Sequence, residues 1–445
     1  MRRGTAGALL PTAGVRRRAA AAAPTLSSNW IASHQAPSYA DPAARRSALL
    51  IVLGVASVVA RLHELFPPLR PFRPILLVVL IAVAGTMAAR KSARLTTSVF
   101  SDPSLLMLYA YWGWMLVTIP TSVYRSQSVH VAFDMLLVFV FATALAAQPP
   151  TLRQVRTISR GFVIVVALFG LLLLLFGQPM MDVDELRYAI TASLDPNDCA
   201  GLLAIGAPMA LAEARRPGRA SWRAMCWGMF AVICLATIRT ASRGGLIALI
   251  VGIAFVLISS RGVRMIITFA VVGAMLLIGR EFVPEGLLPK RLATIGNLSE
   301  DYNFNIYGGR VQIWKRGVKY FTEDPVLGIG IGGFQVREGQ QMAEDGVPGH
   351  WSAPHSAYVQ AFAELGLIGG LLFCGSIVIS LRRVAPIFRR PSPVTGTTHP
   401  EYFASVLAFS SSAVFLSHAY FWGFFALVAL CSLASQALIP SARAR

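Results

Sequence analysis

Charged residues are scarce in this sequence of 445 residues. Asp, Glu, Lys and Arg together make up only 14% of the chain, whereas 55% of it is hydrophobic. In soluble domains roughly a quarter of the residues are charged, because their surfaces face water. The shortage of charge therefore excludes an ordinary soluble protein of this length and indicates a protein embedded in lipid.

Cysteine is also scarce, and the five cysteines avoid the polar parts of the chain. They lie in or beside apolar runs, at Cys199, Cys226, Cys234, Cys374 and Cys431. This distribution predicts neither a disulfide framework nor a thiolate metal site. No pair of aspartates at metal-ligand spacing stands beside the motifs described below. We therefore expect no metal ion and no cofactor.

Long apolar runs are what the sequence has instead. About 20 helical residues cross the ~30 Å of hydrocarbon in a bilayer, and continuous rather than alternating runs favour helices over a β-barrel. The sequence predicts an all-α integral membrane protein with about twelve transmembrane helices, without an internal repeat. The predicted spans are residues 47–66, 74–90, 104–120, 129–147, 161–177, 198–214, 221–239, 244–259, 263–279, 357–381, 402–417 and 419–438.

Basic residues outnumber acidic ones by 40 to 21, which gives a net charge of +19. Their distribution argues against a nucleic-acid partner. With the N-terminus in the cytoplasm, 25 of the 40 fall in predicted cytoplasmic segments and only six in the short outer loops. This is the positive-inside pattern of a multi-pass inner-membrane protein with both termini in the cytoplasm. Membrane lipids with anionic headgroups are the partners that it implies.

The predicted topology divides the chain into four parts. Residues 1–46 are rich in Ala, Arg and Pro, and we expect a disordered cytoplasmic tail. Residues 47–279 hold transmembrane helices 1–9. Residues 280–356 form one large, nearly neutral loop in the periplasm, which we expect to be catalytic. Residues 357–445 hold helices 10–12 and a short cytoplasmic tail.

The large loop contains an amphipathic segment, RVQIWKRGVKYF. Val311, Trp314, Val318 and Phe321 share one face of a helix there, and we expect this helix to lie on the membrane surface. Pro325 ends it, and the glycines that follow permit close backbone approach. A nucleotide-binding glycine loop is disfavoured, because we expect neither a strand before these glycines nor a helix after them.

Three motifs follow one another in the second half of the chain. SRGG (242–245) begins a span, GGRVQIW…DPVLGIGIGGF (308–334) lies in the large loop, and PHSAYVQAFAELGLIGG (354–370) enters the next span. In this order, within about twelve spans, they resemble the O-antigen ligase and polymerase superfamily. These bacterial inner-membrane glycosyltransferases use glycans linked to undecaprenyl diphosphate. The resemblance covers roughly residues 195–375.

The resemblance departs from the family pattern at one position. The family usually has His-Asn where this chain has His355 followed by Ser356. Serine keeps a hydrogen-bonding group but shortens it, which puts the contact of that second residue in doubt. The histidine itself is retained.

The resemblance implies transfer of a glycan from undecaprenyl diphosphate to a sugar hydroxyl, metal-independent and with inversion, in surface polysaccharide synthesis. The acceptor is a lipid A core or another lipid-linked repeat, with a protein acceptor also open. Arginine suits the diphosphate because it is always charged and binds bidentately, and histidine suits a general base because its pKa is near 6.5. We expect Arg243 and Arg310 to bind the diphosphate and His355 to be the catalytic base.

Purely structural roles stay open for these three residues. Arg243 could snorkel at a helix end, Arg310 could be a surface charge, and His355 could be an interfacial histidine. The helix dipole slightly disfavours a cation at the start of a helix, so local stability does not account for Arg310.

Four further residues are candidates for supporting roles. Arg239 lies one helical turn before Arg243, Tyr358 follows His355, and Glu364 lies inside the same predicted span, where an ionisable group has either a function or a structural partner.

The fourth candidate, Asp198, lies in LDPNDCA. There Asp195 and Pro196 predict a helix start, with Asp195 as the N-cap. Helix capping is the structural interpretation of this motif. In the functional alternative, Asp198 faces outward and contacts sugar hydroxyls.

A transporter or lipid flippase is the alternative function, because twelve spans with both termini inside fit many transporters. The sequence shows no inverted repeat and no matched pair of broken helices. Its charged candidates also gather at one membrane face rather than at the midplane.

Overall fold

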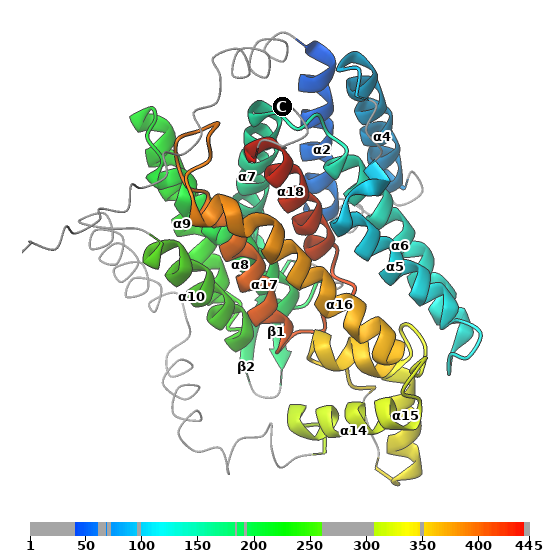
Figure 1. Cartoon of the computed structure of the whole chain (residues 1–445). Coiled ribbons are helices and arrows are strands. Elements are labelled where there is room, and N and C mark those ends of the chain that lie inside the picture. Colours follow the sequence, from blue (N-terminus) through cyan, green and yellow to red (C-terminus); the bar gives the residue numbers. More distant parts are fainter. Residues whose placement is uncertain are drawn as a thin grey trace, which may run out of the picture.

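The computed structural model describes residues 41–60, 68, 73–95, 99–182, 185–190, 194–259, 307–347 and 351–439. In this part of the chain it contains thirteen α-helices, one 3₁₀ helix and one two-stranded sheet (Figure 1). The predicted all-α class is confirmed, apart from the short sheet. The predicted span 263–279, loop residues 280–306 and most of the N-terminal tail lie outside the described residues.

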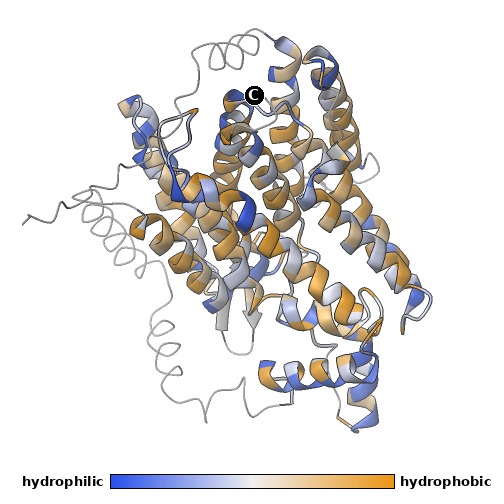
Figure 2. Ribbon diagram, in the orientation of Figure 1, coloured by the Kyte–Doolittle hydropathy of each residue, from blue (hydrophilic) through white to orange (hydrophobic). Residues whose placement is uncertain are grey.

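Eleven of the twelve predicted spans correspond to helices. They are α2 (Pro42–Ala60), α4 (Pro74–Ser92), α5 (Pro103–Val117), α6 (Arg125–Ala146), α7 (Leu152–Phe176), α8 (Pro196–Arg215), α9 (Ala220–Arg239), α10 (Arg243–Ile258), α16 (Ala357–Arg389), α17 (Pro400–Ala413) and α18 (Trp422–Leu438). The short 3₁₀ helix η2 (Val99–Ser101) precedes α5. Apolar residues dominate the bundle that these helices form (Figure 2).

The predicted number of twelve membrane spans is not confirmed. Among the described residues, six helices are long and apolar enough to cross a membrane, namely α2, α4, α6, α7, α9 and α16. Four others, α5, α10, α17 and α18, have 14 to 17 residues, fewer than the roughly 20 that a bilayer requires. The length and composition of the six long helices nevertheless support a multi-pass membrane protein.

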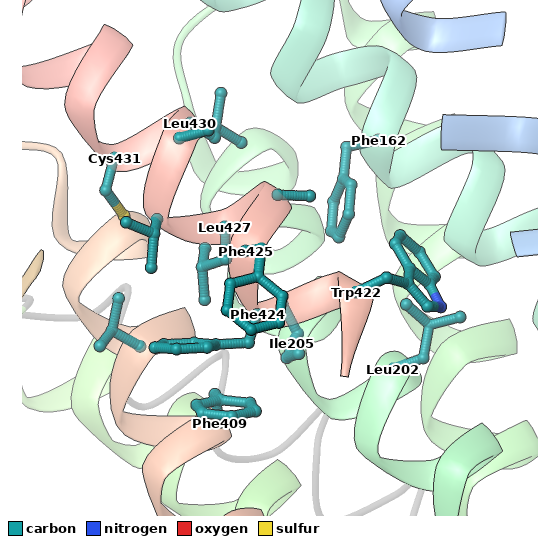
Figure 3. Packing of buried hydrophobic residues seen from close by; sticks show 14 of the residues in the cluster. Phe162, Leu202, Ile205, Phe409, Trp422, Phe424, Phe425, Leu427, Leu430 and Cys431 are labelled. Carbon is teal, nitrogen blue, oxygen red and sulfur yellow. The ribbon is translucent and has the colours of Figure 1, made fainter. Parts of the chain in front are cut away.

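The centre of the bundle is the C-terminal helix α18, which is buried around its whole circumference. Every residue of α18 is buried except Gln436, as is typical of an apolar helix inside a large protein. Phe424 stacks on Phe409 of α17, with ring centroids 4.3 Å apart. Leu202 of α8 joins the same cluster (Figure 3).

Helix α8 is the second buried helix, and it begins as the sequence predicts. The Asp195 side chain caps it by accepting a hydrogen bond from the Asp198 amide, and Pro196 occupies the first turn. Small residues along α8 let its neighbours approach closely. At Gly206, for example, an added Cβ would lie 2.7 Å from Val166 of α7. The buried start of α8 therefore fixes the position of Asp198.

Helix α16 is not the continuous span that the sequence predicts, because Gly366 breaks it with φ 65° and ψ −165°. The glycine-rich segment 324–334 pairs with the broken turn. The Ile329 amide donates to the Ala363 carbonyl at 3.0 Å, and the Leu367 amide donates to the Pro325 carbonyl at 2.8 Å. These bonds replace helical ones that the break removes. The loop is thereby fixed to the bundle.

Two polar helices of the large loop are described, α14 (Arg310–Glu323) and α15 (Phe334–Glu344) (Figure 2). The buried face of α14 consists of Ile313, Gly317 and Tyr320. The predicted apolar stripe lies on a neighbouring side, and its Val318 is 56% exposed. The expectation that no helix follows the glycines was wrong, since α15 begins directly after Gly333.

A buried ion pair joins α14 to α15. The Arg316 guanidinium contacts the Glu338 carboxylate, with Nη2 and Oε2 2.6 Å apart, and the Tyr320 hydroxyl donates to Glu338 Oε1 at 2.7 Å. Burial and this hydrogen bond raise the pKa of Tyr320. Glu338 is fully buried, so it requires both partners to offset the loss of hydration.

A β-hairpin, β1 (Gln178–Asp182) and β2 (Glu185–Ala189), was not predicted. The strands pair antiparallel, with Gln178 opposite Ala189. Figure 1 shows the hairpin at the same end of the bundle as α14 and α15. Helix α2 begins, and α18 ends, at the opposite end.

Candidate functional site

Four segments far apart in the sequence meet at the end of the bundle that carries the large loop. They are the start of α8 (195–198), the turn between α9 and α10 (240–243), the start of α16 (354–357) and the connection between α17 and α18 (414–421). Two hydrogen bonds between side chains and one from a backbone amide to a side chain link these segments. These segments contain three of the predicted site residues.

His355 has an unusual backbone conformation. Its φ of 48° lies in the left-handed region, which few residues other than glycine adopt. Its amide donates to Ser417 Oγ at 2.9 Å, and this bond holds the turn. The side chain is half-buried at the start of α16.

Ser356 has a structural role that the resemblance to the family pattern did not suggest. It is the buried N-cap of α16, where its Oγ accepts a hydrogen bond from the Val359 amide at 3.4 Å. Serine is among the preferred N-cap residues. The substitution for the usual asparagine therefore keeps the helix start in place.

Arg243 is the first residue of α10, and the rest of the SRGG motif explains its position. Ser242 caps α10 and also donates from Oγ to Asn197 Oδ1 at 2.9 Å, which ties this turn to the start of α8. Gly245 faces Ala200, and an added Cβ would overlap that residue. Close packing of α10 on α8 thus places the half-buried Arg243 beside the Asp198 segment.

Arg310 is the first residue of α14, and a neighbouring tryptophan connects it to the His355 segment. Trp314 Nε1 donates to the carbonyl oxygen of Pro354 at 3.1 Å. Residues four apart share a helix face, so Arg310 lies on the side of α14 that meets the start of α16. The structure therefore brings Arg310, His355, Arg243 and Asp198 to one end of the bundle.

Asp198 lies in the first turn of α8 and is held by a histidine that the sequence analysis missed. His418 Nε2 and Asp198 Oδ1 are 2.9 Å apart. The His418 side chain is 1% exposed and that of Asp198 is 31% exposed. Asp198 is therefore a carboxylate that is fixed from inside the bundle while part of it reaches the surface.

Arg239, Tyr358 and Glu364 make structural contacts. The Arg239 guanidinium lies 4.4 Å from the ring centroid of Tyr188 in β2. The Tyr358 hydroxyl donates to the Ser410 carbonyl of α17 at 3.1 Å.

Glu364 holds the glycine loop. Its carboxylate accepts hydrogen bonds from the Gly332 amide at 2.9 Å, the Phe334 amide at 3.1 Å and the Tyr420 hydroxyl at 2.6 Å. The structure thus identifies the structural partner of this buried acid. The amides of the glycine loop face a carboxylate of the same chain, which is not the arrangement of a phosphate-binding loop.

The site combines positively charged groups with the carboxyl groups of Asp195 and Asp198. The N-termini of α8, α10 and α16 lie there, and each carries a partial positive charge. Arg243 and Arg310 add two full charges. Across the described ranges, no group of three or more His, Cys, Asp and Glu residues has an arrangement that could hold a metal ion.

The sequence offers a weak signal for the residues that were missed. His418 separates the predicted spans 402–417 and 419–438, and a histidine between two apolar runs is unusual. Asn197 and Arg187 give no comparable signal. Their contact, in which Arg187 Nη2 donates to Asn197 Oδ1 at 2.6 Å, depends on the unpredicted strand β2.

Comparison with known proteins supports the resemblance that the motifs suggested. No protein of curated function matches this chain. Residues 227–374 match the protein-family model described as O-antigen ligase. This segment contains Arg239, Arg243, Arg310, His355 and Glu364, while Asp198 and His418 lie outside it. Over residues 227–374 the chain is therefore similar to the O-antigen ligase family, in agreement with the resemblance that the motifs carry.

Proposed function

We propose that this protein transfers a glycan from undecaprenyl diphosphate to a sugar hydroxyl at the periplasmic face of the inner membrane. The family match supports a ligase- or polymerase-type role in surface polysaccharide synthesis. The acceptor in this proposal is a lipid A core or another lipid-linked repeat.

The observation that supports the proposal is that the segments holding His355, Arg243 and Arg310 lie at one end of the bundle. The three residues come from α16, α10 and α14, and their segments are joined by the hydrogen bonds described above. A diphosphate needs positive charge around it, and an acceptor hydroxyl needs a base nearby. This arrangement offers both.

In the proposed reaction, the acceptor oxygen attacks C1 of the donor sugar from the face opposite the diphosphate. The new C–O bond forms as the bond from C1 to the diphosphate oxygen breaks, so the configuration inverts. The acceptor proton passes to His355, and undecaprenyl diphosphate leaves. Arg243 and Arg310 stabilise the negative charge that grows on the leaving oxygen. The proposed reaction uses no metal ion.

The left-handed conformation of His355 is consistent with this role. Backbone strain of this kind costs roughly 1–3 kcal/mol and collects at functional sites. Here the contact of the His355 amide with Ser417 maintains it.

The test is glycan transfer by purified protein in liposomes with a lipid-linked donor. His355→Ala is expected to lower turnover by about 10²–10⁴-fold, the usual loss when a general base is removed. Arg310→Lys keeps the charge but not the planar fork, so it should also lose activity. His130→Ala is the control, because His130 is exposed on α6 and belongs to none of the four segments that meet at the site.

Wild-type turnover in His355→Ala would contradict the proposed base. Movement of a solute across the liposome membrane without consumption of lipid-linked glycan would favour the transporter alternative.

A further inference from the structure

We propose that Asp198 binds a hydroxyl group of a sugar and that His418 is the positioning residue that holds Asp198 for this contact. The inference rests on the proposed glycosyl transfer. It assigns a role to a pair of residues that lies outside the segment matched by the family model.

The His418 ring is fixed by the residues around it. It stacks on Phe421, with centroids 4.3 Å apart and planes 12° apart, and Phe409 lies nearly parallel at 6.4 Å. Gly201 of α8 faces the edge of the ring, where an added Cβ would overlap Cε1. The ring can therefore neither flip nor withdraw without disturbing α8 or α17.

The hydrogen-bonding pattern assigns the proton of His418 to Nε2. Nδ1 is buried and has no hydrogen-bond partner within the described part of the chain. A buried N–H without an acceptor is rarer than a buried lone pair without a donor, because the unpaired donor costs more. The neutral ring with its proton on Nε2 therefore fits best, and Nε2 donates to Asp198 Oδ1.

This bond leaves Asp198 with a second oxygen that no described residue engages. Oδ2 accepts no hydrogen bond from the described ranges, and the side chain is 31% exposed.

The chemistry of a carboxylate limits what it can bind. Asp198 repels the oxygens of a diphosphate, whereas it accepts hydrogen bonds from O–H groups. Within the proposed reaction, the O–H groups belong to sugars. Asp198 is thus the complement of Arg243 and Arg310, which attract the diphosphate.

The same short segment holds both His355 and Asp198. Ser417 Oγ accepts a hydrogen bond from the His355 amide, and the next residue, His418, donates a hydrogen bond to Asp198. Two adjacent residues therefore set the positions of the proposed base and of the carboxylate. This shared segment is the reason for assigning Asp198 to the same sugar-binding region as His355.

Donor and acceptor glycans both carry hydroxyls, so the experiment measures KM for each separately. His418→Phe keeps a flat ring between Phe409 and Phe421 but removes the donor to Asp198. His418→Gln restores a donor, and Asp198→Asn removes the charge. Gly201→Ala displaces the ring without changing any polar group. Thermal stability of each variant in detergent shows that it folds.

In His418→Phe and Asp198→Asn, KM for one of the two glycans is expected to rise about ten- to a hundredfold, as for loss of a hydrogen bond to a charged group. The kcat of these two variants at saturating glycan should change only a few-fold. Gly201→Ala is expected to raise KM as His418→Phe does. His418→Gln should have a KM between those of His418→Phe and the wild type.

Unchanged KM values for both glycans in folded His418→Phe would overturn the inference. So would a loss confined to kcat, because Asp198 would then act in the chemical step. Absence of glycan transfer by the wild-type protein would instead refute the proposed function, so the two failures are distinguishable.

Discussion

At the scale of single residues, the site depends on backbone conformations that side chains seldom adopt. Ala241 and His355 have φ values of 53° and 48°. Each directly precedes a serine N-cap, Ser242 of α10 and Ser356 of α16. The left-handed conformation costs roughly 1–2 kcal/mol for a residue with a Cβ. The entries to both helices are therefore strained in the same way, beside the residues proposed to bind and react.

This strain predicts opposite effects for two substitutions four residues apart. Ala241→Gly removes the steric cost and is expected to raise the free energy of unfolding by about 0.5–1 kcal/mol, after the greater entropy of unfolded glycine is subtracted. Gly245→Ala adds a Cβ that overlaps Ala200 and should lower the free energy of unfolding by roughly 1–3 kcal/mol. Thermal unfolding in detergent measures both changes.

Gly228→Ala on α9 is the control, because a Cβ added at Gly228 meets no atom within 4 Å. A helical alanine there should be neutral or slightly stabilising. If Ala241→Gly destabilised the protein more than Gly245→Ala, the left-handed conformation of Ala241 would be contradicted.

The sequence predicts a site residue when local chemistry determines it. Asp195 and Pro196 form a helix start by their side-chain chemistry alone, and the structure confirms the cap. The motifs likewise indicate Arg243, Arg310 and His355 before any fold is known. His418 could not be found in this way, because its partner Asp198 is 220 residues earlier in the chain.

At the scale of elements, the large loop is joined to the bundle through the break in α16. The amides of Ile329 and Gly330 donate hydrogen bonds to carbonyl oxygens that precede the break. The Glu364 carboxylate accepts hydrogen bonds from the amides of Gly332 and Phe334. The sequence shows the glycines and Pro325 but cannot show which helix they meet. A continuous span was predicted because Gly366 alone, in an apolar run, does not reveal that another segment crosses there.

The break predicts that Gly366 cannot be replaced. Gly366→Ala adds a Cβ that overlaps the Val326 carbonyl oxygen, at a residue with φ 65°. Backbone cannot move aside cheaply, so stability should fall by more than about 2 kcal/mol and the glycine loop should detach. Limited proteolysis should then cut near residues 324–334 faster than in the wild type.

Gly375→Ala on the same helix is the matched control. The nearest atoms to its added Cβ are the Cε and Sδ of Met107, at 3.3 and 3.4 Å, and methionine adapts readily. Equal proteolysis of the two variants would show that the loop is not held by the break.

At the scale of the whole molecule, the end opposite the site has a different character. Arg216, after α8, pairs with Glu213 and with Glu401 of α17, and His399 Nδ1 lies 2.7 Å from its Nη2. This contact brings the connections 216–219 and 390–399 to the same end. Arginines are frequent in and beside both, at Arg215, Arg216, Arg219, Arg223, Arg382, Arg383, Arg389 and Arg390.

The sequence predicts the helices of this architecture well, because apolar runs are a local signal. Eleven predicted spans correspond to helices, yet six have the length and composition of a membrane span. The difference is largely one of length, because α5, α10, α17 and α18 have only 14 to 17 residues. An apolar run shows that a helix forms, but it does not fix the residue at which the helix ends.

The positive-inside pattern then predicts which end of the molecule faces the cytoplasm. Reporter domains can be inserted at Gly218, Gly346 and Gly396, where an added Cβ would meet no atom within 4 Å, because open turns tolerate insertion best. Gly218 and Gly396 lie in the arginine-rich connections, and Gly346 follows α15 in the large loop. We expect the reporter to be cytoplasmic at Gly218 and Gly396 and periplasmic at Gly346.

The pattern of signals distinguishes two kinds of failure. Opposite locations for Gly218 and Gly396 would contradict the contact of Arg216 with Glu401, and therefore the fold itself. Reversal of all three signals would keep the fold but place His355, Arg243 and Arg310 at the cytoplasmic face. A donor glycan that has already crossed to the periplasm could not reach them there, so the proposed transfer at the outer face would be refuted while the helical architecture stood.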